Sequence, residues 1–196
     1  MKSHLYKQVC TIGLSLVLAG CGTTMSGRLD GTQYISRSGD LACSFPGLTR
    51  DKMLTDYLGD DGEWISINFA GVDIERIERF VLGKGAVERV TDANALADAL
   101  LPLYMVKSER IKSAEVIMRK PVALGTRGGL FTLLAFDTFT PENQPQRKRD
   151  IRGILWLVNE KYGTAIHVYN WGYKDTDAEK IEKRVLGVVQ DCSFRG

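Results

Sequence analysis

The sequence predicts an α+β fold, a single domain in which an antiparallel sheet has helices packed on it. Two hairpin patterns in the second half of the chain and two capped helical patterns are the observations behind this prediction. The 196 residues are 44% hydrophobic and 26% charged, which is the composition of an ordinary globular protein long enough to bury a core. Because the sequence contains no internal repeat, we assign residues 40–196 to one globular domain.

The domain begins with strand patterns. Residues 41–45 are a short apolar run that Pro46 and Gly47 end. Residues 53–58 and 64–69 flank the turn signal Gly-Asp-Asp-Gly at 59–62, which predicts a hairpin. The acidic residues at this turn lack the spacing of a twelve-residue calcium loop, so we interpret them as a solvated turn.

Two helices are predicted in the middle of the chain. Residues 73–82 are expected to form a short helix that Gly83 ends. Its apolar positions, at helical spacing, are Ile74, Ile77 and Val81. A second helix is expected to begin near Asp92, with Thr91 or Asp92 as its cap, and to kink or restart at Pro102. Its apolar face consists of Leu96, Leu100 and Leu103.

The later half of the domain is dominated by strand patterns. The two predicted hairpins pair residues 116–124 with 130–140 and residues 154–158 with 164–171. Residues 130–136 are apolar on both alternating sets, which indicates a central strand covered on both faces. Residues 141–150 are polar and bounded by proline, and we expect an exposed loop there.

A last helix is predicted from a capping box. Thr176 is followed three residues later by Glu179, which is the spacing of that motif. The apolar stripe after it consists of Ile181, Val185 and Val188. This helix is expected to bring Cys192 back toward the first strand.

The first twenty residues form a separate segment. Lys2 and Lys7 precede an apolar run over residues 9–19, too short to cross a hydrocarbon core that needs about 20 apolar residues. This is the pattern of a secretory signal peptide. The segment ends in Leu18-Ala19-Gly20-Cys21, which resembles the bacterial lipobox, in which the cysteine becomes the first residue of the mature lipoprotein.

The lipobox resemblance implies an acyl anchor. The Cys21 thiol would carry a diacylglycerol and its amino group a further acyl chain, and several chains anchor a protein more stably than one. The alternative is an ordinary signal peptide cut near Ala19. By similarity to enteric lipoproteins, Gly22 implies sorting to the outer membrane, facing the periplasm. Residues 21–39 are rich in Gly, Ser and Thr and are predicted to be the lipidated N-terminus and a flexible tether.

Charge and cysteine usage limit the possible functions. The chain has 26 basic and 24 acidic residues, and two of the basic ones precede Cys21, so the mature chain is balanced at 24 of each. This balance argues against nucleic-acid binding, which needs clustered positive charge. Cys43 and Cys192 are expected to form a disulfide in an oxidising envelope, the alternative being two separate buried thiols.

The sequence offers few candidates for chemistry. His167 is the only histidine of the mature chain, so neither a metal centre nor a cofactor is predicted, and we interpret it as a half-buried structural residue. No catalytic or phosphate-binding motif is present, so we predict a protein that is not an enzyme. An enzyme using His167 and nearby carboxylates is the least favoured hypothesis.

Two surface features could contact a partner. Arg147, Lys148 and Arg149 form a basic run that could meet anionic lipid headgroups, although we favour a solvated loop because Asp150 dilutes the patch. Trp171 belongs to an aromatic set on the second late hairpin, with Trp156, Tyr162, Tyr169 and Tyr173. Such residues suit recognition, and they also suit a sheet face packed beneath a helix, which we favour.

Together these features predict a membrane-anchored envelope lipoprotein of structural or protein-interaction type. Its expected partners are the membrane, through the acyl chains on Cys21, and an envelope protein. The alternative is a lipid- or glycan-binding periplasmic module that holds its ligand between sheet and helices.

Overall fold

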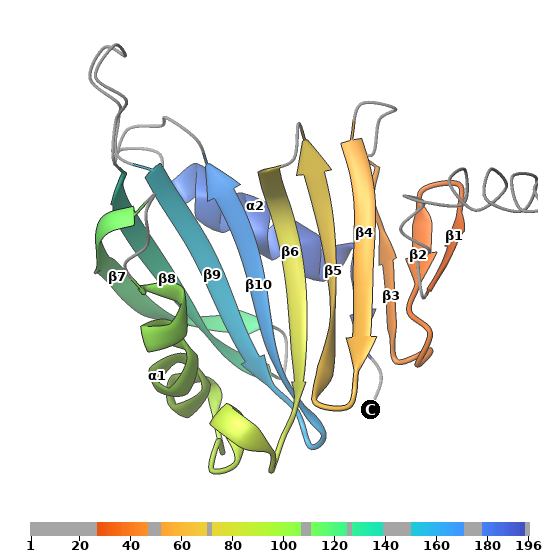
Figure 1. Cartoon of the computed structure of the whole chain (residues 1–196), viewed down its shortest axis with the longest axis horizontal. Helices are drawn as coiled ribbons and strands as arrows, with labels where there is room; N and C mark the ends of the chain where they lie inside the picture. The colour runs from red at the N-terminus through yellow and green to blue at the C-terminus, as the bar shows by residue number, and fades with distance from the viewer. Residues whose placement is uncertain are drawn as a thin grey trace, which may run out of the picture.

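The structure, a computed structural model, describes residues 27–46, 52–69, 72–106, 111–124, 127–138, 150–170 and 178–194. These residues form two antiparallel sheets and two α-helices (Figure 1). The large sheet contains, in spatial order, β4 (Lys52–Gly59), β5 (Gly62–Phe69), β6 (Val72–Val81), β10 (Tyr162–Asn170), β9 (Asp150–Val158), β8 (Arg127–Thr138) and β7 (Ile111–Leu124). The small sheet contains β1 (Arg28–Asp30), β2 (Gln33–Ile35), β3 (Leu41–Ser44) and β11 (Cys192–Phe194). The α+β class and the three predicted hairpins are confirmed.

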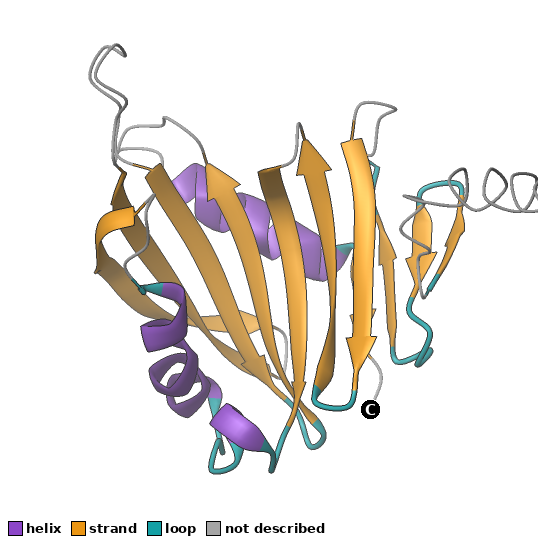
Figure 2. Ribbon diagram, in the orientation of Figure 1, coloured by secondary structure: helices purple, strands orange, loops and turns teal. Residues whose placement is uncertain are grey.

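The helices lie on opposite faces of the large sheet (Figure 2). Helix α1 (Ala93–Tyr104), which follows the 3-10 turn η1 (Gly85–Val87), packs its apolar face on β8 and β9. Helix α2 (Ala178–Gln190) packs on the other face, where its buried Ile181, Val185 and Val188 confirm the predicted stripe. The small sheet shares this second core with α2 through Tyr34, Leu41 and Cys43.

Two glycines in the central strands let the helices approach the sheet closely. A Cβ at Gly153 of β9 would lie 2.4 Å from Cγ2 of Ile181 in α2. On the opposite face, a Cβ at Gly163 of β10 would lie 2.7 Å from a methyl carbon of Leu96 in α1. Each helix therefore packs over a strand position that has no side chain, which explains glycine in the middle of a strand.

The helix predicted for residues 73–82 is wrong, because this segment is strand β6. β6 lies between β5 and β10, and its charged residues are satisfied by neighbouring groups that the local pattern does not reveal. Arg79, for example, pairs with Glu63 of β5 at 2.6 Å. Pairing with two long strands has overridden a local pattern that fits a helix.

Helix α1 is confirmed, with one exception on its apolar face. The Asp92 side chain caps it by accepting a hydrogen bond from the Ala95 amide at 2.8 Å. Pro102 lies within the last turn of the helix. Leu103, predicted to be buried, is 60% exposed. The apolar stripe of the helix is made of four buried residues: Leu96, Ala97, Leu100 and Leu101. At 3.6 residues per turn, the middle of this stripe lies about 90° around the helix axis from Leu103.

The predicted tether is wrong in its second half. Residues 28–30 and 33–35 form β1 and β2, and the Tyr34 side chain is buried and donates a hydrogen bond to Asp56 of β4 at 2.6 Å. The folded domain therefore includes residues before 40. The disulfide between Cys43 of β3 and Cys192 of β11 is present as predicted.

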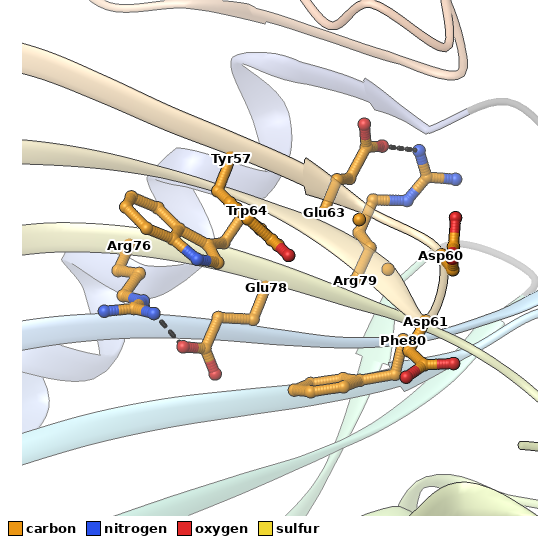
Figure 3. Close-up of a pocket in the computed structure, with 11 residues that line it drawn as sticks. Tyr57, Asp60, Asp61, Glu63, Trp64, Arg76, Glu78, Arg79 and Phe80 are labelled. Atoms are coloured by element: carbon orange, nitrogen blue, oxygen red, sulfur yellow. Dashed lines mark hydrogen bonds and ion pairs between the residues drawn. The ribbon is translucent and has the colours of Figure 1, made fainter. Parts of the chain in front are cut away.

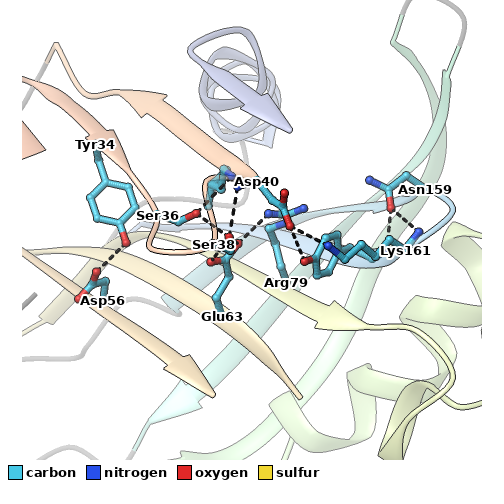
Figure 4. Close-up of polar contacts among 11 residues, drawn as sticks. Tyr34, Ser36, Ser38, Asp40, Asp56, Glu63, Arg79, Asn159 and Lys161 are labelled. Atoms are coloured by element: carbon cyan, nitrogen blue, oxygen red, sulfur yellow. Dashed lines mark hydrogen bonds and ion pairs between the residues drawn. The ribbon is translucent and has the colours of Figure 1, made fainter. Parts of the chain in front are cut away.

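A buried ion pair helps to fix the small sheet on the large one (Figure 4). Arg79 is 1% exposed, and its guanidinium pairs with Glu63 at 2.6 Å and lies 3.8 Å from the ring centroid of Tyr162. The Ser38 hydroxyl, from the loop between β2 and β3, donates to Glu63 at 3.2 Å. In the same loop, Asp40 accepts hydrogen bonds of 2.8 Å from the Lys161 ammonium and the Tyr162 hydroxyl.

Candidate functional site

Part of the large sheet is not covered by either helix. α1 packs on β8 and β9 and reaches β6 through Tyr104, and among the described elements no helix packs on the same face of β4 and β5. Strand pairing aligns Tyr57, Trp64 and Glu78 in one row across these three strands, and Ser66, Arg76 and His167 in the next row across β5, β6 and β10. Residues opposite each other in an antiparallel pair point to the same face. We call the Tyr57, Trp64 and Arg76 surface the open face.

The open face has an aromatic and cationic surface layer (Figure 3). Tyr57 is 55% exposed, and its ring stacks on Trp64 with the centroids 6.1 Å apart. The Arg76 guanidinium lies 4.5 Å from the Trp64 ring centroid. The Tyr57 ring passes over Gly59, where a Cβ would lie 2.6 Å from its hydroxyl oxygen. The Arg76 guanidinium restricts the movement of the Trp64 ring, and the backbone at Gly59 restricts that of the Tyr57 ring.

A buried polar cluster lies beneath this layer. Glu78 pairs with Arg76 at 2.6 Å and accepts a hydrogen bond from the Tyr104 hydroxyl of α1. The Nε2 atom of His167 lies 3.3 Å from the second carboxylate oxygen of Glu78. The His167 side chain is fully buried, with the Tyr104 ring packed edge-on at 4.8 Å and the Tyr169 ring stacked at 6.2 Å. The prediction of a half-buried histidine is therefore wrong, because α1 brings Tyr104 over it.

The cluster contains a charged carboxylate and a neutral imidazole. Burial alone would raise the pKa of Glu78, but its contacts with His167, Arg76 and Tyr104 outweigh burial and lower that pKa to about 2. Burial lowers the pKa of His167, with Arg152 and Arg76 adding to this effect and Glu78 opposing it. At neutral pH the carboxylate is ionised and the imidazole carries no charge.

Arg152 lies beside this cluster on β9. Its guanidinium carbon is 4.1 Å from the Tyr169 ring centroid and 4.8 Å from that of Phe136. Burial lowers the pKa of this guanidinium, which stays charged at neutral pH. Its Nε atom is buried and has no hydrogen-bond partner among the described residues.

The open face borders a shallow pocket of about 300 Å³ at the turn between β4 and β5. Its wall includes Trp64, Arg76, Glu78 and Phe80, and the turn residues Asp60 and Asp61 lie at its rim (Figure 3). The described residues contain no group of three or more His, Cys, Asp or Glu side chains that could hold a metal ion. The exposed Tyr57 ring and the partly exposed Trp64 ring lie beside this pocket, whereas the His167 side chain is fully buried.

The sequence identified only part of this site. Cys21, Trp171 and the basic residues Arg147, Lys148 and Arg149 lie outside the described residues. Of the loop predicted over 141–150, residues 141–149 also lie outside them, and Asp150 is not in a loop but begins β9. Trp156 and Tyr162 are buried, so packing explains these two members of the aromatic set, as favoured. The sequence did not indicate Tyr57, Trp64, Arg76, Glu78 and Arg152 as one group. An alternating interpretation of residues 72–81 would have placed Arg76 and Glu78 on one strand face.

Comparison with known proteins shows only a fold. No family model and no curated protein matches the chain. The solution structure of cyanobacterial PsbP (CyanoP) from Synechocystis sp. PCC 6803 is similar, with a TM-score of 0.51 and 8% identity over 89% of this chain and 96% of that one. The Ran-binding protein Mog1p of Saccharomyces cerevisiae gives a TM-score of 0.44 with 12% identity over 87% and 96% of the two chains. In the described residues, no helix is long and apolar enough to cross a membrane.

Proposed function

We propose that the protein is a membrane-anchored lipoprotein of the cell envelope that binds a partner protein through the open face. The observation that carries this proposal is the uncovered layer of Tyr57, Trp64 and Arg76 over a buried charged cluster. Trp, Tyr and Arg are the residues that most often dominate the binding energy of protein interfaces. Their rings and guanidinium already contact one another, so binding would cost little side-chain entropy.

The proposed anchor is the acylated Cys21 at the outer membrane, with the domain facing the periplasm. The lipobox resemblance supports it, and the Cys43–Cys192 disulfide supports an oxidising compartment. The folded domain begins no later than β1 at Arg28, so at most a few residues separate it from the anchor. We therefore propose that the domain acts close to the membrane surface.

We propose that this protein acts by binding and not by catalysis. Full burial of His167 between α1 and the sheet supports this, because a general base must reach its substrate within hydrogen-bond distance. Glu78 is likewise engaged by Arg76, Tyr104 and His167.

Site-directed photo-crosslinking in the native envelope tests the proposed interface. A benzoylphenylalanine at position 57 of the lipidated chain should give one defined protein adduct, and Trp64→Ala should remove it. The matched control places the crosslinker at Lys183, exposed on α2 of the opposite face. Equal adducts from positions 57 and 183, or none from position 57, would contradict the proposal.

A glycan ligand is the second candidate function. The Tyr57–Trp64 stack lies beside a pocket of about 300 Å³ whose rim carries Asp60 and Asp61, a combination that suits a sugar ring. A lipid cleft has less support, because the apolar pocket lined by Leu157 and Phe194 measures only about 240 Å³. Titrating peptidoglycan fragments against Trp64 fluorescence tests the glycan: a saturable change that Tyr57→Ala removes would favour it, and no change would exclude it.

A further inference from the structure

We propose that Arg152 forms a carboxylate-binding subsite next to the open face, which takes an acidic side chain of the partner protein. This inference rests on the proposed function and names the chemical group that the partner must present. It depends on an arginine that is fixed in position, poorly solvated and not neutralised by the residues around it.

The position of Arg152 is fixed by two aromatic rings. Phe136 of β8 and Tyr169 of β10 lie on the strands at either side of β9, and their ring centroids are 4.8 and 4.1 Å from the guanidinium carbon. Contact with a ring face stabilises a cation only weakly compared with the water that a guanidinium loses on burial. The rings therefore orient the guanidinium without replacing the hydration that it loses on burial.

No described residue neutralises Arg152. It forms no ion pair within the part of the chain that the structure describes, and its buried Nε atom has no hydrogen-bond partner there. Glu78 is the carboxylate whose charge acts on Arg152. That carboxylate is already engaged by Arg76 at 2.6 Å, by the Tyr104 hydroxyl and by His167 at 3.3 Å.

Among the described residues, the charged groups around the site leave one positive charge in excess. Arg76 and Arg152 supply two guanidinium cations, Glu78 supplies one carboxylate, and His167 is neutral. A buried cation without a counter-ion is costly, and an incoming anion removes this cost. The planar fork of a guanidinium matches a carboxylate with two parallel hydrogen bonds, which a lysine cannot do.

An acidic protein segment is the occupant that the surroundings favour. The open face supplies rings for the apolar part of a protein surface, and Arg152 supplies a directional contact for one carboxylate on it. Such a contact adds specificity, because a partner that lacks the acid would leave the guanidinium unpaired.

The test is an NMR titration of the full mature chain with Cys21→Ser, which lacks only the acyl groups. We expect the Arg152 Nε–Hε resonance to shift saturably with sodium acetate at constant ionic strength, and not with chloride. A hexaglutamate peptide should bind about tenfold more weakly to Arg152→Gln and Arg152→Lys. Arg119→Gln, which removes an exposed arginine of β7, is the matched control and should bind as the parent chain does.

Several results would overturn the proposal. Equal shifts with acetate and chloride would remove the subsite, as would unchanged peptide affinity in Arg152→Gln. Saturation by inorganic phosphate alone, or Arg152-dependent binding to anionic lipid vesicles without peptide binding, would assign the site to a phosphate. If Arg152→Gln fails to fold, the shift of the Arg152 Nε–Hε resonance with acetate in the parent chain still tests the subsite. The titration needs no partner, so its failure leaves the crosslinking result from Tyr57 intact.

Discussion

Cys192 lies directly opposite Cys43 in the ladder between β11 and β3, and a disulfide joins these two residues across 149 positions of sequence. The bond fixes the last strand of the chain to the first core strand of the domain. It also holds the small sheet closed over the core that it shares with α2. Nearly the whole domain therefore lies within one covalent loop.

Removing this disulfide should destabilise the domain strongly. In the chain-entropy model, a loop of this length contributes on the order of 5 kcal/mol. We expect Cys43→Ala with Cys192→Ala to lower the free energy of unfolding by several kcal/mol in urea titrations. Reductant should have the same effect on the parent chain and none on the variant. A loss below about 1 kcal/mol would show that the bond contributes little.

Breaking the buried Glu63–Arg79 pair should loosen the small sheet. Glu63→Gln removes the carboxylate that pairs with the buried Arg79 guanidinium at 2.6 Å, and breaking a buried ion pair typically costs about 3–5 kcal/mol. The matched control is Asp98→Asn, which breaks the solvent-exposed pair with Arg119 and should cost at most about 1 kcal/mol. Urea unfolding of both variants makes the comparison. Equal losses of unfolding free energy in the two variants would mean that burial does not make the Glu63–Arg79 pair stronger than the exposed Asp98–Arg119 pair.

Acidification should destabilise the domain in two steps. The pKa of His167 is lowered by burial, so below its ordinary value of 6.5 the unfolded chain binds a proton that the folded chain does not. Stability then falls as the pH drops below 6.5. Glu78, with a folded-state pKa of about 2, adds a second loss as the pH falls from 4.5 toward 2.

Urea unfolding between pH 7.5 and 5.5 tests the first step. His167→Gln should lose the decrease in unfolding free energy that the parent chain shows over this range. Glu160→Gln, which changes an exposed carboxylate in a turn, should keep it. If the parent chain is equally stable at both pH values, the pKa of His167 is not lowered in the folded protein. That result would contradict the buried, neutral imidazole described above.

A methyl group at Gly153 should force α2 away from the sheet. The Cβ of Gly153→Ala would lie 2.4 Å from Cγ2 of Ile181, and overpacking of this kind costs about 1–3 kcal/mol. Gly128→Ala adds the same methyl group where no atom lies within 4 Å, so it should leave the thermal midpoint nearly unchanged. Ile181→Leu, which removes Cγ2, should recover part of the loss in Gly153→Ala. No recovery would argue against this contact.

Replacing Cys21 should release the protein from the membrane. Cys21→Ala removes the thiol that the lipobox resemblance assigns to the diacylglycerol. We expect the variant to lose incorporation of labelled palmitate and to leave the membrane fraction. Cys10→Ala, which changes the cysteine within the predicted signal peptide, should retain both. A Cys21→Ala protein that still carries the label would refute the anchor.

The sequence predicted the elements whose signals are local. The Gly-Asp-Asp-Gly turn at residues 59–62, the Asp92 cap and the apolar stripe around Val185 each identify an element within a few residues. β6 was missed because its apolar spacing fits a helix, and only pairing with β5 and β10 decides for a strand. β1 and β2 are three residues each, too short for an alternating pattern.

The open face could not be predicted for a related reason. Its residues come from separate strands, and their alignment depends on the register of three strand pairs. Tyr57 and Trp64 are near neighbours in sequence, but Arg152 reaches the cluster only because β9 lies beside β10. The sequence also does not show that α1 brings Tyr104 onto Glu78.

Hydroxyl-radical footprinting of the protein expressed from its full sequence tests the central claim most directly. Labelling of Tyr57 and Trp64 should fall several-fold in native envelope membranes relative to the same protein in vesicles of purified lipid. Met118, partly exposed on β7 at the far edge of the sheet, should be labelled alike in both. Protection of Tyr57 and Trp64 alone is the result expected for a partner on the open face. Equal labelling of Tyr57 in envelope and vesicles, or protection of α2 in its place, would contradict it.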